Sequence, residues 1–205
     1  MDWLVAISLS LGAYFLGSIP SAYILVYLVK GVDIRQHGSK NVGALNTYHQ
    51  VGAWGALLVL LADAAKGVAA VVVPAWLGAP DWTVFATTLL VVAGHNWPLF
   101  LKFRGGKGAA AILGISLALV PVLTLIALGP VVLIALLSRN VVIAAGLGFI
   151  LLNTLLLVTD QAIEQVAICI FLTLVVTVTY LVSIWGHITV SIKSRRWREL
   201  FTGLA

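Results

Sequence analysis

The residues best suited to chemistry lie between Gly94 and Gly108. The stretch reads Gly94-His95-Asn96-Trp97-Pro98-Leu99-Phe100-Leu101-Lys102-Phe103-Arg104-Gly105-Gly106-Lys107-Gly108. Its glycines leave the backbone free to turn several N–H groups toward one point, beside Lys102, Arg104 and Lys107. Such a nest at the start of a helix binds phosphate or another oxyanion. The alternative is a positively charged loop between two membrane helices with no chemistry of its own.

A second polar segment, residues 38–46, lies earlier in the chain, before the apolar run at about 51–77. Ser39, Asn41 and Asn46 supply hydrogen-bonding side chains, and Gly38 and Gly43 space them. This pattern suits a polyol phosphate, because hydroxyl and amide groups bond a polyol while a turning backbone approaches it closely. A generic polar loop would show a similar composition, so both interpretations stand at this point.

Two opposite charges, Asp63 and Lys66, interrupt the second apolar run. Their i,i+3 spacing places them on the same helix face. A lone charge is expensive in hydrocarbon, so we expect them to pair or one of them to reach an aqueous cleft. An ion pair that fixes helix packing and a substrate-binding Lys66 are both open.

The composition identifies a membrane protein. Of 205 residues, 61% are hydrophobic and 9% are charged, against about 25% charged in soluble domains. We therefore predict an all-α integral membrane protein, with residues 1–205 as a single membrane domain. Apolar runs long enough to span number seven, the fourth being short, at about 3–29, 51–77, 83–101, 109–120, 123–137, 141–158 and 165–185. Pro121 separates the fourth from the fifth, because the residue before a proline avoids the helical region.

The charges orient these seven predicted spans. Eleven of the 12 Lys and Arg residues fall on one side, and the remaining one, Lys66, lies within a span. The positive-inside rule then predicts an N-terminus outside and a cytoplasmic C-terminus. Six spans would separate Arg139 and the basic C-terminal segment from the other basic loops, so we reject that count. The segment 193–198 is typical of an interfacial tail that binds anionic lipid head groups.

These motifs together resemble the bacterial membrane-bound glycerol-3-phosphate acyltransferases that use acyl phosphate as donor. The resemblance covers nearly the whole chain, with motifs in the family's order. They are Gly17-Ser18-Ile19-Pro20, Val32-Asp33-Ile34-Arg35, Gly38-Ser39-Lys40-Asn41-Val42-Gly43-Ala44-Leu45-Asn46, Asp63-x-x-Lys66-Gly67 and the stretch from Gly94 to Gly108. Lys40 stands where the family has Gly, Leu45 where it has Thr, and His49 where it has an Arg thought to bind phosphate. His187 lacks the asparagine of the family's His-x-x-Asn-Ile run.

The resemblance implies transfer of an acyl group from acyl phosphate to sn-glycerol 3-phosphate, giving lysophosphatidic acid for phospholipid biosynthesis. It implies a multi-pass protein of the bacterial plasma membrane with its active site at the cytoplasmic face. An acyl phosphate is already activated, so a Ser–His nucleophile is not required. We expect no cofactor, no metal and no nucleic acid as partner. A transport-type protein and a non-catalytic protein that binds lipid phosphate are the alternatives.

The resemblance and the residue types together assign roles. Lys107 stabilises charge on the donor, His95 assists proton transfer or orients a partner, and Ser39 positions the acceptor; these three are the predicted catalytic residues. A substrate phosphate is the expected base. The predicted substrate-binding residues are Gly38, Asn41, Gly43, Asn46, His49, Lys66, Lys102, Arg104, Gly105, Gly106 and His187.

Overall fold

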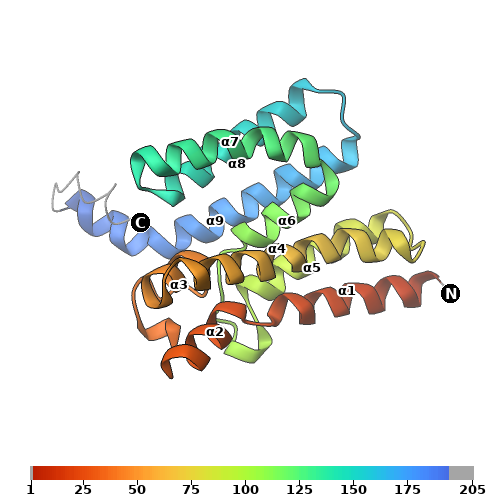
Figure 1. Ribbon diagram of the computed structural model, residues 1–205. Coiled ribbons are helices and arrows are strands. Elements are labelled where there is room, and N and C mark those ends of the chain that lie inside the picture. Colours follow the sequence, from red (N-terminus) through yellow and green to blue (C-terminus); the bar gives the residue numbers. More distant parts are fainter. Residues whose placement is uncertain (1, 194–205) are drawn as a thin grey trace. The chain divides into compact units, whose positions relative to one another are not determined.

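Helices account for every regular element in the part of the chain that the structure describes. The structure is a computed structural model that describes residues 2–193, with the side chains of residues 3–185 (Figure 1). The internal contacts divide the chain into two compact units, Met1–Leu119 and Val120–Ala205. The all-α class predicted from the sequence is thereby confirmed.

The first unit contains every element up to Leu119. In chain order these are α1 (Asp2–Ser18), α2 (Ser21–Lys30), η1 (Ile34–Gln36), α3 (Ala44–Val51), α4 (Ala53–Trp76), α5 (Trp82–Asn96), η2 (Leu99–Leu101) and α6 (Ala109–Leu119). The predicted first span, 3–29, is therefore two helices. Pro20 causes the break: it is the N-cap of α2, with φ −91° and ψ 77°, and has no N–H to continue α1.

Glycines bring the helices of the first unit into close contact. α1 packs against α5, and α4 packs against α6. A Cβ on Gly17 or Gly94 would overlap the backbone of the opposite helix in the first pair, and Gly67 and Gly114 do the same in the second. Small residues at such crossings let helix backbones approach each other in membranes. These four glycines therefore set the spacing of the helices that carry the polar residues.

The sequence analysis missed α3. It begins after Gly43, whose backbone is extended, and ends at Gly52, where φ is 88°. The positive φ at Gly52 changes the direction of the chain between the two helices. α4 therefore begins at Ala53 rather than at the predicted residue 51. The polar segment 32–46 is consequently a 3₁₀ turn, a loop and the first turn of a short helix.

The second unit consists of α7 (Pro121–Ser138), α8 (Val141–Val158) and α9 (Ile163–Lys193). Pro121 occupies the first turn of α7, where its missing N–H costs nothing, so the predicted break before it is confirmed. Asn140 caps α8, accepting from the N–H groups of Val142 and Ile143 at 3.1 Å each. α7 packs against α8, and α8 against α9.

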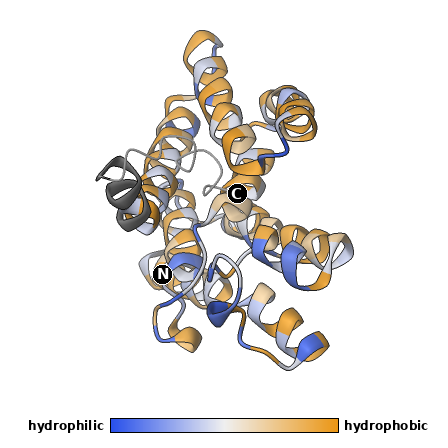
Figure 2. Cartoon of the chain, turned by 90° about the vertical axis from the view of Figure 1, so that its left-hand side faces the viewer, coloured by the Kyte–Doolittle hydropathy of each residue, from blue (hydrophilic) through white to orange (hydrophobic). Residues whose placement is uncertain are grey.

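Six helical stretches of the described chain are long and apolar enough to cross a membrane. They are Trp3–Lys30, Ala53–Trp76, Trp82–Leu101, Pro121–Ser138, Val141–Val158 and Ile163–Trp185. The predicted fourth span is the shorter helix Ala109–Leu119 of 11 residues, which reaches about 17 Å against a hydrocarbon core of about 30 Å. Figure 2 shows hydrophobic residues along most of each long helix and hydrophilic residues gathered in short stretches.

Candidate active site

The break between α1 and α2 is held by a buried lysine on α4. The side chain of Lys66 is 6% exposed, and its Nζ donates to the Asp63 carboxylate at 2.7 Å, to the Ser21 hydroxyl at 2.7 Å and to the Ile19 carbonyl at 2.5 Å. These three bonds use all three ammonium hydrogens. Lys66 thus satisfies the backbone where Pro20 interrupts the helix, which is the structural role that the sequence left open beside a contact with substrate.

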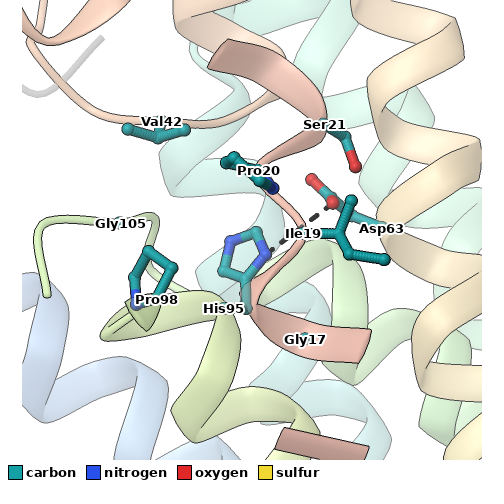
Figure 3. A pocket seen from close by; sticks show the side chains of 9 residues that line it. All are labelled: Gly17, Ile19, Pro20, Ser21, Val42, Asp63, His95, Pro98 and Gly105. Atoms are coloured by element: carbon teal, nitrogen blue, oxygen red, sulfur yellow. Dashed lines mark ion pairs between the residues drawn. The ribbon is translucent and has the colours of Figure 1, made fainter. Parts of the chain in front are cut away.

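Asp63 also faces His95, at the end of α5. His95 Nδ1 lies 3.8 Å from Asp63 Oδ1, and both side chains are buried (Figure 3). They line a small cavity together with Ser21 and with residues of α1 and of two loops; the space open to the centre of a water molecule is ≈ 10 Å³. The buried ionisable residues Asp63, Lys66 and His95 thus converge on one point beside the helix break.

The glycine loop, residues 104–108, folds back onto the end of α5. The N–H of Gly105 donates to the carbonyl of Asn96 at 3.2 Å, and the N–H of Gly106 donates to the carbonyl of His95 at 3.0 Å. The chain leaves the helix before Pro98, which has no N–H, so these carbonyls need other donors. In this structure the two glycine N–H groups cap α5, and their binding of phosphate stays a prediction.

The glycines are required because the loop lies against its neighbours. A Cβ on Gly105 would overlap the His95 carbonyl oxygen. One on Gly106 would overlap His95 Nε2 and lie 2.7 Å from the Val42 carbonyl oxygen. At Gly108 the backbone has φ +84°, a conformation that side chains disfavour.

Three cations belong to the segment around this loop. Lys102 and Arg104 are exposed, and Lys107 is half-buried. Burial lowers the pKa of the Lys107 ammonium below its usual range. Lys102 and Phe103 both have left-handed backbones, with φ of 55° and 61°. Consecutive non-glycine residues in this region are costly and concentrate at functional sites.

Residues 37–43 form a loop, called the acceptor loop below, that is fixed by hydrogen bonds from the side chain of Asn46. This side chain is fully buried, and its Nδ2 donates to the carbonyls of Ile34 at 3.3 Å, His37 at 3.0 Å and Asn41 at 3.0 Å. Asn46 thus organises the loop, and its contact with substrate stays a prediction. Gly38, with φ +56°, passes so close that a Cβ there would overlap the Asn46 side chain.

The surface of the acceptor loop carries the other predicted binding residues. Ser39 and Lys40 are exposed, Asn41 and Gly43 are partly buried, and His49 is exposed in the last turn of α3. Lys40 has a left-handed backbone, with φ 60°. This conformation is the physical reason for a glycine at that position in the family pattern.

Arg35 links the acceptor side of the site to the segment before the glycine loop. Its guanidinium pairs with Asp33 at 2.7 Å and donates to the Leu101 carbonyl at 3.0 Å. The bond with Arg35 lowers the pKa of Asp33. Neither residue was among the predicted site residues. The sequence signal that could have identified them is an acidic and a basic residue two positions apart, shortly before a glycine-rich loop.

One predicted residue cannot be placed as a side chain. His187 lies within α9, in the part of that helix where the structure does not describe side chains. The basic residues 195–198 lie outside the described residues.

Comparisons with known proteins agree on one family. The protein-family model described as "Glycerol-3-phosphate acyltransferase" matches residues 7–192. A curated "Glycerol-3-phosphate acyltransferase" of Halalkalibacterium halodurans is 39% identical over 191 residues, covering 91% of this chain and 88% of the relative. The protein of the same name from Desulforamulus reducens is 37% identical over 161 residues, or 78% and 80% of the two chains.

Solved structures give the same result. The glycerol 3-phosphate form of PlsY (YgiH), an integral membrane glycerol 3-phosphate acyltransferase, has a TM-score of 0.81 and 30% identity, covering 98% of this chain and 94% of that one. The lysophosphatidic acid form of PlsY has a TM-score of 0.77 and 29% identity, covering 98% and 93%. The likeness extends over almost the whole chain.

Proposed function

This chain belongs to the glycerol-3-phosphate acyltransferase family, and from that premise we propose the reaction that its two loops carry out. It acylates sn-glycerol 3-phosphate to lysophosphatidic acid, a step of phospholipid synthesis. The acyl donor is an acyl phosphate. One observation supports the assignment to these loops most directly: a Cβ on Gly106 would lie 2.7 Å from the Val42 carbonyl oxygen, so the acceptor and glycine loops adjoin.

The reaction joins a glycerol hydroxyl to the acyl carbon. The hydroxyl oxygen attacks this carbon, the new ester C–O bond forms, and the bond from the carbon to the phosphate oxygen breaks. The phosphate leaves with the electron pair, and the hydroxyl proton passes to a substrate phosphate oxygen. Lys107 neutralises the charge that develops on the donor, which is where a fixed cation contributes most to the rate.

The remaining residues hold the two phosphate-bearing substrates. Ser39 and Asn41 bond the glycerol part, where Gly38 and Gly43 let the backbone approach closely. His49, Lys102 and Arg104 supply positive charge to the phosphates. Gly105 and Gly106 shape the loop that presents Lys107, while Asn46 and Lys66 act from within the scaffold.

The site faces the cytoplasm of a bacterial cell, in the plasma membrane. We propose seven crossings, with the short helix α6 as the fourth, and with residues 1–205 working as one membrane domain. The distribution of Lys and Arg supports an N-terminus outside and a cytoplasmic C-terminus. Both substrate loops then lie on the basic, cytoplasmic side.

A comparison of donors tests the proposal. Purified protein is given labelled glycerol 3-phosphate with either an acyl phosphate or the acyl-CoA of the same chain length, and labelled lysophosphatidic acid is measured. Product is expected with acyl phosphate and not with acyl-CoA, because the loops on this side are short and form no obvious adenine pocket. Comparable turnover of acyl-CoA would overturn the donor assignment.

A further inference from the structure

Asp63 and His95 are buried ionisable residues that lie beneath the substrate loops. Asp63 is 2% exposed and His95 9% exposed. Burial of ionisable groups at membrane depth is costly and usually marks a functional arrangement. His95 also lies below the glycine loop rather than on its surface, which does not suit direct proton transfer to a substrate.

We infer that Asp63 and His95 are positioning residues: Asp63 orients the His95 ring, and the ring holds the glycine loop against the acceptor loop. This inference rests on the proposed function, since it concerns how the backbone that carries Lys107 is held beside the acceptor loop. It assigns to Asp63 a role in the reaction that the sequence did not suggest.

Asp63 is suited to orient the ring because its charge is already balanced. Its Oδ1 accepts from Lys66 at 2.7 Å and faces His95 Nδ1 at 3.8 Å. The second distance exceeds a direct hydrogen bond, and the adjoining cavity of ≈ 10 Å³ has room for one bridging water. A carboxylate on the Nδ1 side fixes the orientation of an imidazole and therefore the direction of its other nitrogen.

The other nitrogen faces both loops. A Cβ on Gly106 would overlap His95 Nε2 and would lie 2.7 Å from the Val42 carbonyl oxygen. The backbone of Gly106 is thus held between the ring and the acceptor loop, while its own N–H bonds to the His95 carbonyl at 3.0 Å. Figure 3 shows His95 between Asp63 on one side and Val42 and Gly105 on the other.

Lys107 follows Gly106 directly, so a shift of the glycine loop moves the catalytic cation. A displacement of about 1 Å can cost about a hundredfold in rate. The same shift separates the two loops and weakens binding of glycerol 3-phosphate. A positioning role therefore predicts changes in both kcat and KM, whereas a proton-transfer role predicts a change in kcat alone.

The first experiment tests the contact without using activity. Thermal unfolding of the purified protein in detergent is measured for Gly106→Ala, His95→Ala and the double variant. The loss of Tm caused by Gly106→Ala should be smaller when His95 is already Ala, because the ring that would be overlapped is gone. Gly105→Ala is the matched control. It clashes with the His95 carbonyl, which His95→Ala retains, so its effect should add to that of His95→Ala. Additivity in both pairs would refute the contact.

The second experiment separates positioning from proton transfer. Asp63→Asn, which keeps an oxygen acceptor, should lower kcat/KM for glycerol 3-phosphate less than Asp63→Ala. His95→Asn should lower it about 10–100-fold through both kcat and KM. Thr87→Val, which removes a buried α5 hydroxyl bonded to the Ala70 carbonyl at 2.6 Å, should change it less than twofold. A fall in kcat alone, with loss of a limb of the pH profile, would contradict positioning by His95.

The two experiments distinguish failure of the inference from failure of the proposed function. If the wild-type protein forms no lysophosphatidic acid, the proposed function fails, and the unfolding cycle still decides whether His95 holds Gly106. If the wild type is active and the unfolding cycle is additive, the inference fails and the proposed function stands.

Discussion

The two units of the chain differ in how closely their glycines bring helices together and in how many buried charges they hold. In Met1–Leu119, glycines at positions 17, 67, 94 and 114 press helix backbones together, and buried charges pair inside the scaffold. In Val120–Ala205, a Cβ on Gly129 or Gly146 would meet nothing within 4 Å, and one on Gly148 would overlap a side chain, that of Val131, rather than a helix backbone. The helices of this unit are among the most apolar of the described chain. Close glycine contacts therefore accompany the polar site, and the second unit provides apolar helices. This difference predicts where substitutions act on catalysis, on stability or on neither.

The largest expected effect is that of Lys107→Ala. A fixed cation that stabilises a transition state contributes about 3–4 kcal/mol, so lysophosphatidic acid formation should fall at least about a hundredfold. The control is Arg139→Ala in the second unit, an exposed cation before α8, which should leave the rate within about twofold of wild type. Steady-state rates of both variants measure the comparison. Retention of more than about a tenth of the activity by Lys107→Ala would remove Lys107 from the mechanism.

The second prediction compares glycines of the two units. Gly67→Ala places a methyl group onto the backbone of Ala111, so it should destabilise by about 1–3 kcal/mol. Gly146→Ala has open space and should change stability by no more than about 1 kcal/mol. Thermal unfolding in detergent compares them. Equal losses of Tm in the two variants would show that the first unit is not packed more tightly at its glycines.

The third prediction concerns pH. Because burial lowers the pKa of Lys107, its positive charge is present below that pKa and is lost as the pH rises through it, below the ordinary lysine value of 10.5. The rate should therefore fall on the alkaline side. Lys107→Arg keeps its charge at any accessible pH, so its remaining activity should not show this alkaline fall. Identical alkaline limbs in the two proteins would count against Lys107 as the titrating group.

The smallest effect is expected at His49. Arginine holds a phosphate with two bonds and a permanent charge, whereas histidine is charged only toward acidic pH. His49→Arg should lower the KM for glycerol 3-phosphate a few-fold. Lys40→Gly relieves the left-handed backbone at φ 60° and should leave this KM unchanged. If Lys40→Gly raises the KM and His49→Arg does not lower it, Lys40 supplies the charge in place of His49.

Much of the fold follows from local features of the sequence. Apolar runs located the long helices, and Pro121 located the start of α7, because a proline ends one helix and starts the next. The predicted first span was divided because Pro20 breaks the backbone more completely than a kink would. The short helix α3 was missed because its eight residues are too polar for a span and too few for a clear periodic pattern.

The site was predictable in composition but not in detail. The cations and glycines around Lys107 are visible in the sequence, yet which N–H groups are engaged depends on where the loop folds back. Gly105 and Gly106 bond to the end of α5, and Asn46 bonds three carbonyls, through contacts that no local pattern encodes. The saturation of Lys66 likewise depends on Ile19 and Ser21, more than 40 residues away in the chain.

The central claim is that this protein couples cleavage of an acyl phosphate to acylation of glycerol 3-phosphate. The most direct measurement follows the purified wild-type protein with both substrates and quantifies lysophosphatidic acid and inorganic phosphate together. The account predicts equal amounts of the two products, and no lysophosphatidic acid when glycerol 3-phosphate is omitted. Binding of glycerol 3-phosphate without turnover would contradict it and favour a non-catalytic or transport-type protein, and release of phosphate without lysophosphatidic acid would contradict it by showing hydrolysis of the acyl phosphate in place of acyl transfer.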